Sequence, residues 1–184
     1  MTRRPVWILC ALALALWVPG SASAAPPPNP LAGPYLFVGG GLGGQFGLDV
    51  DNGLAATFRW GPSLELGGDL GPFNAAVGAD LRVPVLTFVA RPLDLDVTAA
   101  LGLITPTPLV RFYVRLRGGL GWRWTAGAKG VMSVLIAPDM GLRFRLPATK
   151  AAFQIGIAAG PRVVPSAIPS STVDVELRLG LKFP

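Results

Sequence analysis

The last stretch of the chain, residues 172–183, alternates apolar and polar side chains at every second position. The apolar positions are Val173, Val175, Leu177, Leu179, Leu181 and Phe183, and the charged positions are Asp174, Glu176, Arg178 and Lys182. A period of two places the apolar side chains on one face of a β-strand and the charged ones on the other. A strand buried in a parallel sheet would be apolar on both faces. This segment therefore predicts a strand between an apolar and a polar environment.

The same alternation recurs along the chain and predicts an all-β fold. Eight segments show it, at residues 35–47, 54–70, 73–83, 93–103, 110–124, 132–146, 153–159 and 172–183. The chain has 24 Gly and 19 Pro, which favour turns between such segments. The mean hydropathy is high, at +0.52, yet no apolar run after the N-terminus reaches the roughly 18 residues of a transmembrane helix. We therefore expect an eight-stranded antiparallel up-and-down transmembrane β-barrel.

The N-terminus has the three parts of a secretory signal peptide. Arg3 and Arg4 supply positive charge, residues 6–18 form an apolar core, and residues 22–24 offer a cleavage site. The arginine pair also occurs in twin-arginine signals, but the residues after it fit that motif poorly. The single cysteine, Cys10, lies in the apolar core, so the mature chain has no thiol chemistry. The predicted domains are a signal peptide at 1–24, a Pro-rich lead-in at 25–34 and the barrel at 35–184.

An even number of strands places both ends of a barrel at one rim, which is the periplasmic rim in outer-membrane proteins. Short turns near Gly71, Thr105 and Pro147 then lie at this rim. The connections near residues 49, 88, 127 and 166 then lie at the opposite rim, on the outside of the cell. Two of them are long, at residues 84–92 and 160–171.

Aromatic residues of apolar parity gather near the two rims, as expected for rings that prefer membrane interfaces. The inner group is Phe73, Phe112, Phe144, Phe153 and Phe183, and the outer group is Phe46, Trp60, Trp122 and Trp124. Tyr35 and Phe37 break the parity of the first segment, so we expect a bulge or a shifted register there.

The polar face of the segments carries charged residues that would fill the barrel interior. The acidic residues of this face are Glu65, Asp69, Asp80, Asp94, Asp96, Asp139, Asp174 and Glu176. The basic residues are Arg59, Arg82, Arg111, Arg115, Arg117, Arg123, Arg143, Arg145, Arg162, Arg178 and Lys182. An eight-stranded barrel is only wide enough for its own side chains, and an unpaired buried charge is costly. We therefore expect an ion-paired network that plugs the lumen, with a narrow anion-preferring pore as the functional alternative.

Other features of the sequence have weaker interpretations. The glycine run 39–44 can be aligned with a nucleotide-binding loop, but no helix follows it. The acidic turn 49–53 resembles part of a calcium loop but lacks the distal Glu. The basic residues alternate with apolar ones and form no stripe, which argues against a nucleic-acid partner. A soluble secreted barrel or sandwich with inverted faces is the alternative fold, because alternation alone does not say which face meets water.

Catalysis has little support in the composition. The sequence has no His, which is the usual general base and a common metal ligand. Asp94 and Asp96 share one face of a segment, but ion pairing with arginine explains them more simply. We expect no enzyme activity, no catalytic residue, no cofactor and no bound metal.

On this pattern, the chain resembles the small eight-stranded outer-membrane barrels of the outer membrane protein A and X type over residues 35–184. In such proteins the final strand has apolar residues at alternate positions and ends in an aromatic residue, and the barrel-assembly machinery recognises this pattern. The resemblance implies that Leu179, Leu181 and Phe183 form this assembly signal. Pro184 departs from the pattern, because the aromatic is usually the last residue.

The resemblance further implies a monomer in the outer membrane of a Gram-negative cell, in contact with membrane lipid and lipopolysaccharide. We expect a structural or surface-interaction role, with a narrow pore or a carrier for a small anionic or hydrophobic molecule as the alternative. Arg123, Lys129 and Arg162 lie near the predicted outer rim, where the phosphates of lipopolysaccharide are expected.

Overall fold

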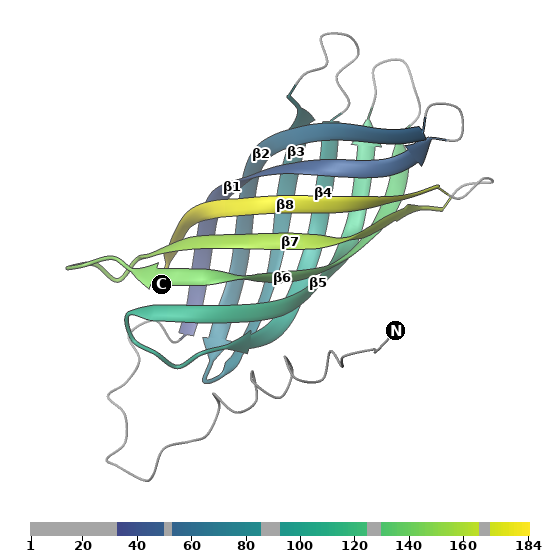
Figure 1. Cartoon of the computed structure of the whole chain (residues 1–184). Coiled ribbons are helices and arrows are strands. Elements are labelled where there is room, and N and C mark those ends of the chain that lie inside the picture. Colours follow the sequence, from purple (N-terminus) through teal and green to yellow (C-terminus); the bar gives the residue numbers. More distant parts are fainter. Residues whose placement is uncertain (1–32, 50–52, 86–92, 125–129, 166–169) are drawn as a thin grey trace, which may run out of the picture.

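The computed structural model describes residues 33–49, 53–85, 93–124, 130–165 and 170–184. Within these residues the strands are β1 (Gly33–Asp49), β2 (Gly53–Leu70), β3 (Phe73–Pro84), β4 (Leu93–Ile104), β5 (Val110–Trp124), β6 (Val131–Arg145), β7 (Ala152–Val164) and β8 (Ser170–Phe183). Each strand pairs antiparallel with the next, and β8 pairs with β1, so that the sheet closes into a barrel (Figure 1). The predicted eight-stranded antiparallel barrel is confirmed.

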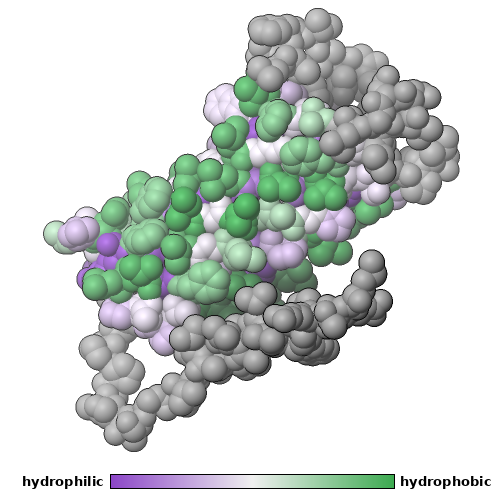
Figure 2. Space-filling view, in the orientation of Figure 1, coloured by the Kyte–Doolittle hydropathy of each residue, from purple (hydrophilic) through white to green (hydrophobic). Residues whose placement is uncertain are grey.

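The two faces of the wall differ as the alternation predicts. Outward side chains are apolar and exposed, reaching 72% for Leu70 and 65% for Leu101. Inward side chains are mostly polar or charged and are buried, as for Arg115 and Asp139. Figure 2 shows hydrophobic residues over much of the wall that faces the viewer. The barrel is therefore apolar outside and polar inside, the inverse of a soluble domain.

The two ends of the barrel are distinguished by their connections. At one end lie Gly33, Phe183 and the turns that join β2 to β3, β4 to β5 and β6 to β7; we call it the turn end. The opposite end, where the other hairpins close, is called the mouth end. This arrangement agrees with the predicted placement of the short turns. Residues near 88, 127 and 166 lie outside the described residues.

Strand β7 is longer than the sequence predicted. It continues to Val164, because Gly160 pairs with Asp174 and Arg162 with Thr172 of β8. The prediction of a long connection over residues 160–171 is therefore wrong for most of its length. Strand β1 likewise begins at Gly33, ahead of the predicted start of the barrel at residue 35.

Strand β1 has no bulge, and its register with β2 is unbroken from Gly33 to Asp49. The expected bulge or shift at Tyr35 and Phe37 is wrong. Both rings point into the lumen and are buried, with Phe37 fully so. They keep the strand's parity and simply place aromatic side chains on the inner face.

The ladder between β2 and β3 has a gap between Trp60 and Ser63. Pro62 lies in this gap and has no N–H to donate to the ladder. The Arg82 guanidinium donates instead to the carbonyl oxygens of Gly61 at 3.2 Å and Pro62 at 2.9 Å. An inward arginine thus satisfies backbone acceptors that the interrupted sheet leaves open.

The β1–β2 hairpin extends past its neighbour at the mouth end. The last β2–β3 pair joins Arg59 and Pro84, and the Val85 N–H donates to the Phe58 carbonyl just beyond it. Residues 53–57 pair with β1 and, among the described residues, with no other strand.

The predicted signal peptide, residues 1–24, lies outside the described residues, as does the lead-in up to residue 32. Among the residues that are described, there is no helix of the length and hydropathy that a membrane crossing requires.

Candidate functional site

The charged lumen is the candidate site, because it gathers nearly all the ionisable side chains of the barrel. The basic members are Arg59, Arg82, Arg111, Arg115, Arg117, Arg123, Arg143, Arg162, Arg178 and Lys182, and the acidic members are Glu65, Asp69, Asp80, Asp94, Asp96, Asp139, Asp174 and Glu176. The other acidic residues of the sequence are Asp49 and Asp51. Every acidic side chain of the lumen has a basic partner. The lumen is thus a network of ion pairs, in three sections along the barrel.

The section at the turn end is built around Asp69, on β2. Its carboxylate accepts hydrogen bonds from Arg111 at 3.0 Å, from Arg143 at 3.0 Å and from the Lys182 ammonium. The Asn74 amide donates to the same carboxylate at 2.6 Å. Three cations from three strands therefore converge on one carboxylate.

Aromatic rings line the same section and make cation–π contacts with its basic side chains and with Arg115. The Lys182 ammonium lies 3.9 Å from the centroid of the Tyr35 ring, and Arg143 lies 5.1 Å from it. Arg143 and Arg115 each lie 4.9 Å from the centroid of the Tyr113 ring. A cation over a ring face is attracted by the ring quadrupole, so these rings partly offset the burial of charge.

Glycines on neighbouring strands make room for these rings. A Cβ at Gly67 would lie 2.6 Å from Cζ of Tyr35, and a Cβ at Gly180 would lie 2.6 Å from the Phe37 ring. A Cβ at Gly156 would overlap the Tyr113 hydroxyl. These three glycines are therefore packing positions for aromatic side chains.

The central section contains four cations and four carboxylates. Arg115 donates to Glu65 at 2.6 Å and to Asp139 at 2.5 Å, and so joins β2 to β6 across the lumen. Arg178 lies 3.4 Å from each of the same two carboxylates. Arg82 pairs with Glu176 and with Asp80, Arg117 pairs with Asp80, and Arg178 lies 3.6 Å from both Asp80 and Glu176.

The section at the mouth end contains three cations and three carboxylates. Arg59 bridges Asp94 at 2.6 Å and Asp174 at 2.9 Å. Arg123 binds Asp94 through Nε at 2.7 Å, with its Nη2 at 2.8 Å from the second oxygen. Arg162 completes the section by binding Asp174 at 2.7 Å and, through two nitrogens, the carboxylate of Asp96.

The charges of the lumen are distributed unevenly. The central section has four cations and four carboxylates and the mouth section has three of each, so both are balanced. The turn-end section has three cations and one carboxylate, a difference of +2. Asp49 is at the opposite end of β1, and the described residues of the turn end include no further acidic side chain that could offset it. The whole surplus of lumen charge is therefore at the turn end.

A cavity of about 230 Å³ lies at the mouth end, above the mouth section. Its lining residues are Gln45, Asp94, Arg123, Val131, Ser133, Arg162, Val164 and Thr172. We call this cavity the vestibule. Most of the described lumen below it is filled by the network.

The structure brings the predicted interior residues together. The residues proposed for the network are Glu65, Asp69, Asp80, Arg82, Asp94, Asp96, Arg111, Arg115, Arg117, Asp139, Arg143, Asp174, Glu176 and Arg178, and all lie in the lumen with an ion-pair partner. Arg145 was also expected inside, but it is exposed, because it is the last residue of β6 and lies past the lumen. Neutral polar side chains also lie on the inner face, at Gln45, Asn74, Ser133 and Gln154. Asn74, Ser133 and Gln154 share the polar parity of their strands, but the predicted network named only charged residues.

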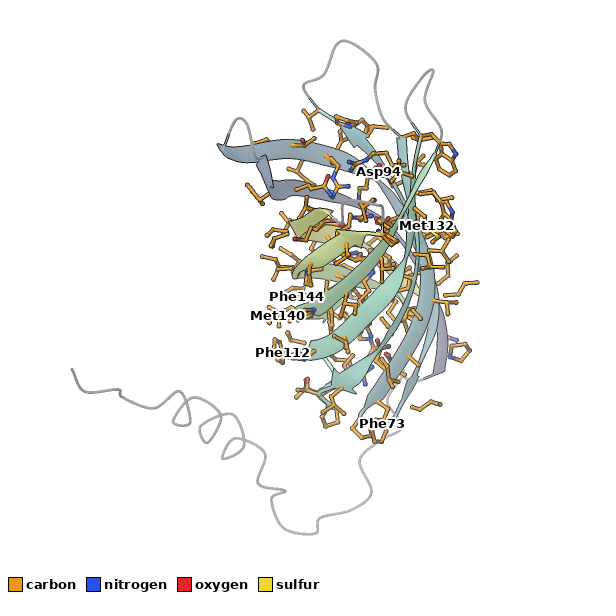
Figure 3. All side chains as sticks on the ribbon, turned by 90° about the vertical axis from the view of Figure 1, so that its right-hand side faces the viewer. Phe73, Asp94, Phe112, Met132, Met140 and Phe144 are labelled. Atoms are coloured by element: carbon orange, nitrogen blue, oxygen red, sulfur yellow. The ribbon has the colours of Figure 1, made fainter. Side chains whose placement is uncertain are left out.

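The predicted aromatic girdle lies on the outer wall. Its exposed members are Phe73, Phe112, Trp124, Phe153 and Phe183, and its half-buried members are Trp122 and Phe144. Phe144 and Phe153 pair directly across β6 and β7. Figure 3 shows Phe73 at the turn end and Asp94 toward the mouth end, with Phe112 and Phe144 on the outside of the wall.

The residues of the expected assembly signal, Leu179, Leu181 and Phe183, lie on the outer face of β8 and are exposed. Two of the three basic residues expected to meet lipopolysaccharide have defined positions. Arg162 is buried and fully engaged by Asp96 and Asp174, so it is not available to a surface ligand. Arg123 is partly exposed, and Lys129 lies outside the described residues.

No protein-family model matches the chain, and no curated protein matches it. Solved structures do match. A crystal structure of Neisserial surface protein A has a TM-score of 0.65 and 14% identity, over 83% of this chain and 97% of that chain. Ail, the attachment invasion locus protein of Yersinia pestis, has a TM-score of 0.50 and 14% identity, over 83% of this chain and 99% of that chain. The chain has the fold of the small eight-stranded outer-membrane β-barrels.

Proposed function

We propose that the protein is a small barrel of the Gram-negative outer membrane, closed to ions by its own side chains, with a structural or surface-interaction role. The apolar outer wall and the closed sheet support the membrane location, because a spanning segment must satisfy its backbone groups internally. In this proposal the turn end faces the periplasm and the mouth end faces outward. The expected signal peptide at 1–24 agrees with export to this location.

The ion-pair network is the observation that supports a closed lumen. It runs through all three sections, and Arg115 in the centre bonds to carboxylates on β2 and β6. An eight-stranded barrel has an interior just wide enough for side chains. An ion could pass only by breaking buried pairs, at a cost of several kcal/mol for each.

A narrow anion-preferring pore or carrier is the second candidate. The surplus of two cations around Asp69 favours it, since a positive lumen would attract anions. The buried positions of Arg111, Arg143 and Lys182 favour the closed lumen instead.

We further propose a monomer without enzymatic activity, assembled by the barrel-assembly machinery through the signal at Leu179, Leu181 and Phe183. Its partners would be outer-membrane lipid and lipopolysaccharide. The absence of His from the sequence supports a non-enzymatic role. One similar structure is named as a surface protein and the other as an attachment invasion locus protein, and a surface-interaction role is in keeping with both names.

Two measurements test this proposal in sequence. The outer-membrane fraction of expressing cells is first run on SDS gels, boiled and unboiled, and a band that shifts on boiling is expected of a folded membrane barrel. A soluble periplasmic band without a shift would contradict the membrane location.

The purified barrel is then added to a planar lipid bilayer to measure conductance. The closed lumen predicts no stable current steps at moderate voltage. Anion-selective steps that change when Lys182→Met removes one surplus cation would instead establish the pore. Steps that are the same in both proteins would point to a leak outside the lumen.

A further inference from the structure

The vestibule has hydrogen-bond donors that the network does not use. Arg123 engages Asp94 through Nε and Nη2, and its Nη2 also donates to the Gln45 amide oxygen at 2.7 Å. Its Nη1 has no partner among the described residues. The Arg123 side chain is 38% exposed, the largest value of any basic member of the network. One edge of this guanidinium therefore faces the cavity as a charged donor.

Two hydroxyl groups line the same cavity, and neither proton has an acceptor among the described residues. The Ser133 oxygen accepts a hydrogen bond from Arg162 at 2.9 Å, and the Thr172 oxygen accepts one from the Gln45 amide at 2.9 Å. A hydroxyl that already accepts can still donate its own proton. The cavity thus offers donors from β5, β6 and β8.

The carboxylate that lines the vestibule, Asp94, and that of Asp174, which binds the lining residue Arg162, do not oppose an anion strongly. Asp94 is bound by Arg59 and Arg123, and Asp174 is bound by Arg59 and Arg162. The mouth section is balanced, so its charges largely cancel beyond their own contacts. The remaining local feature is the free edge of Arg123 with the two hydroxyls.

We infer that the vestibule binds a small oxyanion, a carboxylate or phosphate group, through Arg123, Thr172 and Ser133. Arginine and hydroxyl donors are the groups that proteins use for such oxygens. The volume of about 230 Å³ lies below that of sites for drug-sized ligands, which begin at about 300 Å³. Val131 and Val164 add apolar walls that suit the carbon skeleton of a small organic acid or sugar phosphate. This inference does not depend on the closure of the lumen, since the charged residues that line the vestibule belong to the mouth section alone and not to the central or turn-end sections.

The test measures binding to the folded full-length mature barrel in detergent by isothermal titration. The probes are inorganic phosphate and D-glucuronate, with glucose as the uncharged counterpart and sodium chloride at matched ionic strength as the salt control. We expect saturable binding of both anions and none of glucose. Equal binding of glucose, or no saturable binding of either anion, would overturn the inference.

Matched variants locate the site. Arg123→Gln and Thr172→Val should each weaken anion binding by about tenfold or more, the effect of losing a hydrogen bond to a charged group. Thr172→Val keeps the network intact, so it remains informative if Arg123→Gln folds poorly. Ser133→Ala should weaken binding, whereas Ser63→Ala should not. Ser63 also accepts from an arginine, Arg82, at 3.0 Å, but it does not line the vestibule. Equal effects of the two serine variants would refute the assignment.

The source of the oxyanion is distinguished by competition. Lipopolysaccharide carries phosphate groups that could reach the mouth end from the outer leaflet, whereas a soluble anion would enter alone. Displacement of bound glucuronate by purified lipopolysaccharide assigns the site to the lipid. Retention of glucuronate in the presence of lipopolysaccharide assigns it to a soluble anion.

Discussion

The uneven charge of the lumen leads to a strong prediction about the stability of a variant at Asp69. Replacing it by asparagine keeps the shape of the side chain and removes its charge. Arg111, Arg143 and Lys182 would then be three buried cations with no carboxylate in their section. Removing one partner of a buried pair typically costs about 3–5 kcal/mol, and we expect Asp69→Asn to lose at least the lower value.

Asp96→Asn provides a matched control for this loss. Asp96 has one basic partner, Arg162, which would keep its bond to Asp174 at 2.7 Å. The expected loss is therefore that of hydrogen bonds to a charged group, about 1.5–3 kcal/mol. Asp69→Asn should therefore destabilise the barrel more than Asp96→Asn does, although each variant removes one buried carboxylate.

A second substitution isolates the charge effect. Lys182→Met removes a surplus cation, so it should stabilise the Asp69→Asn background and not the wild type. Contacting residues commonly show coupling energies of about 0.5–3 kcal/mol in such a cycle. Urea titration at fixed detergent concentration, followed by the heat-modifiable gel band, gives the free energy of unfolding of each protein. The reasoning fails if Asp69→Asn lies within about 1 kcal/mol of the wild type, or if Lys182→Met has the same effect in both backgrounds.

Three further predictions concern the wall and the assembly of the barrel. Leu101→Arg places a charge on the outer face and should destabilise the membrane-inserted barrel by about 2–4 kcal/mol; no change in urea midpoint would mean that this face does not meet lipid. Gly156→Ala should destabilise by about 1–3 kcal/mol through overlap with the Tyr113 hydroxyl. Adding Tyr113→Phe should recover part of this loss, and no recovery would place the strain elsewhere. Phe183→Ala should lower the amount of barrel in the membrane fraction of cells but leave refolding of the purified chain unchanged; a refolding defect would indicate a structural role for this ring.

The strand number and the phase of each strand could be predicted because they depend on local alternation. A shift of the strand register by one residue would turn every side chain of that strand to the other face. The sequence must therefore repeat the alternation in each strand. The same logic placed Arg115 and Asp139 in the lumen without any knowledge of their partners. The ends of strands were predicted less well. Arg145 keeps the inward parity and yet is exposed, because parity does not say where the lumen stops.

Contacts across the barrel could not be predicted, since they depend on how strands are staggered around the closed sheet. Tyr35 and Phe37 were read as a break in the pattern because a ring on the polar face looks out of place in one strand. The structure places Gly67 beside Tyr35 and Gly180 beside Phe37, on β2 and β8. The space for each ring therefore comes from a different strand. The concentration of surplus charge around Asp69 has the same origin, because its cations come from β5, β6 and β8.

The β1–β2 hairpin extends beyond β3, so among the described residues this closed sheet has a short unpaired edge on β2. A membrane-spanning strand needs about 9–11 residues, whereas β1 has 17 and β2 has 18. Closure normally removes the free backbone groups to which another chain could pair, but residues 53–57 pair only with β1 among the described residues. In the proposed orientation this ribbon stands outside the bilayer. An extended segment of another protein could add to it as a further strand, held by main-chain hydrogen bonds. Such recognition would tolerate sequence change in the ribbon and would be blocked by a proline that removes one N–H.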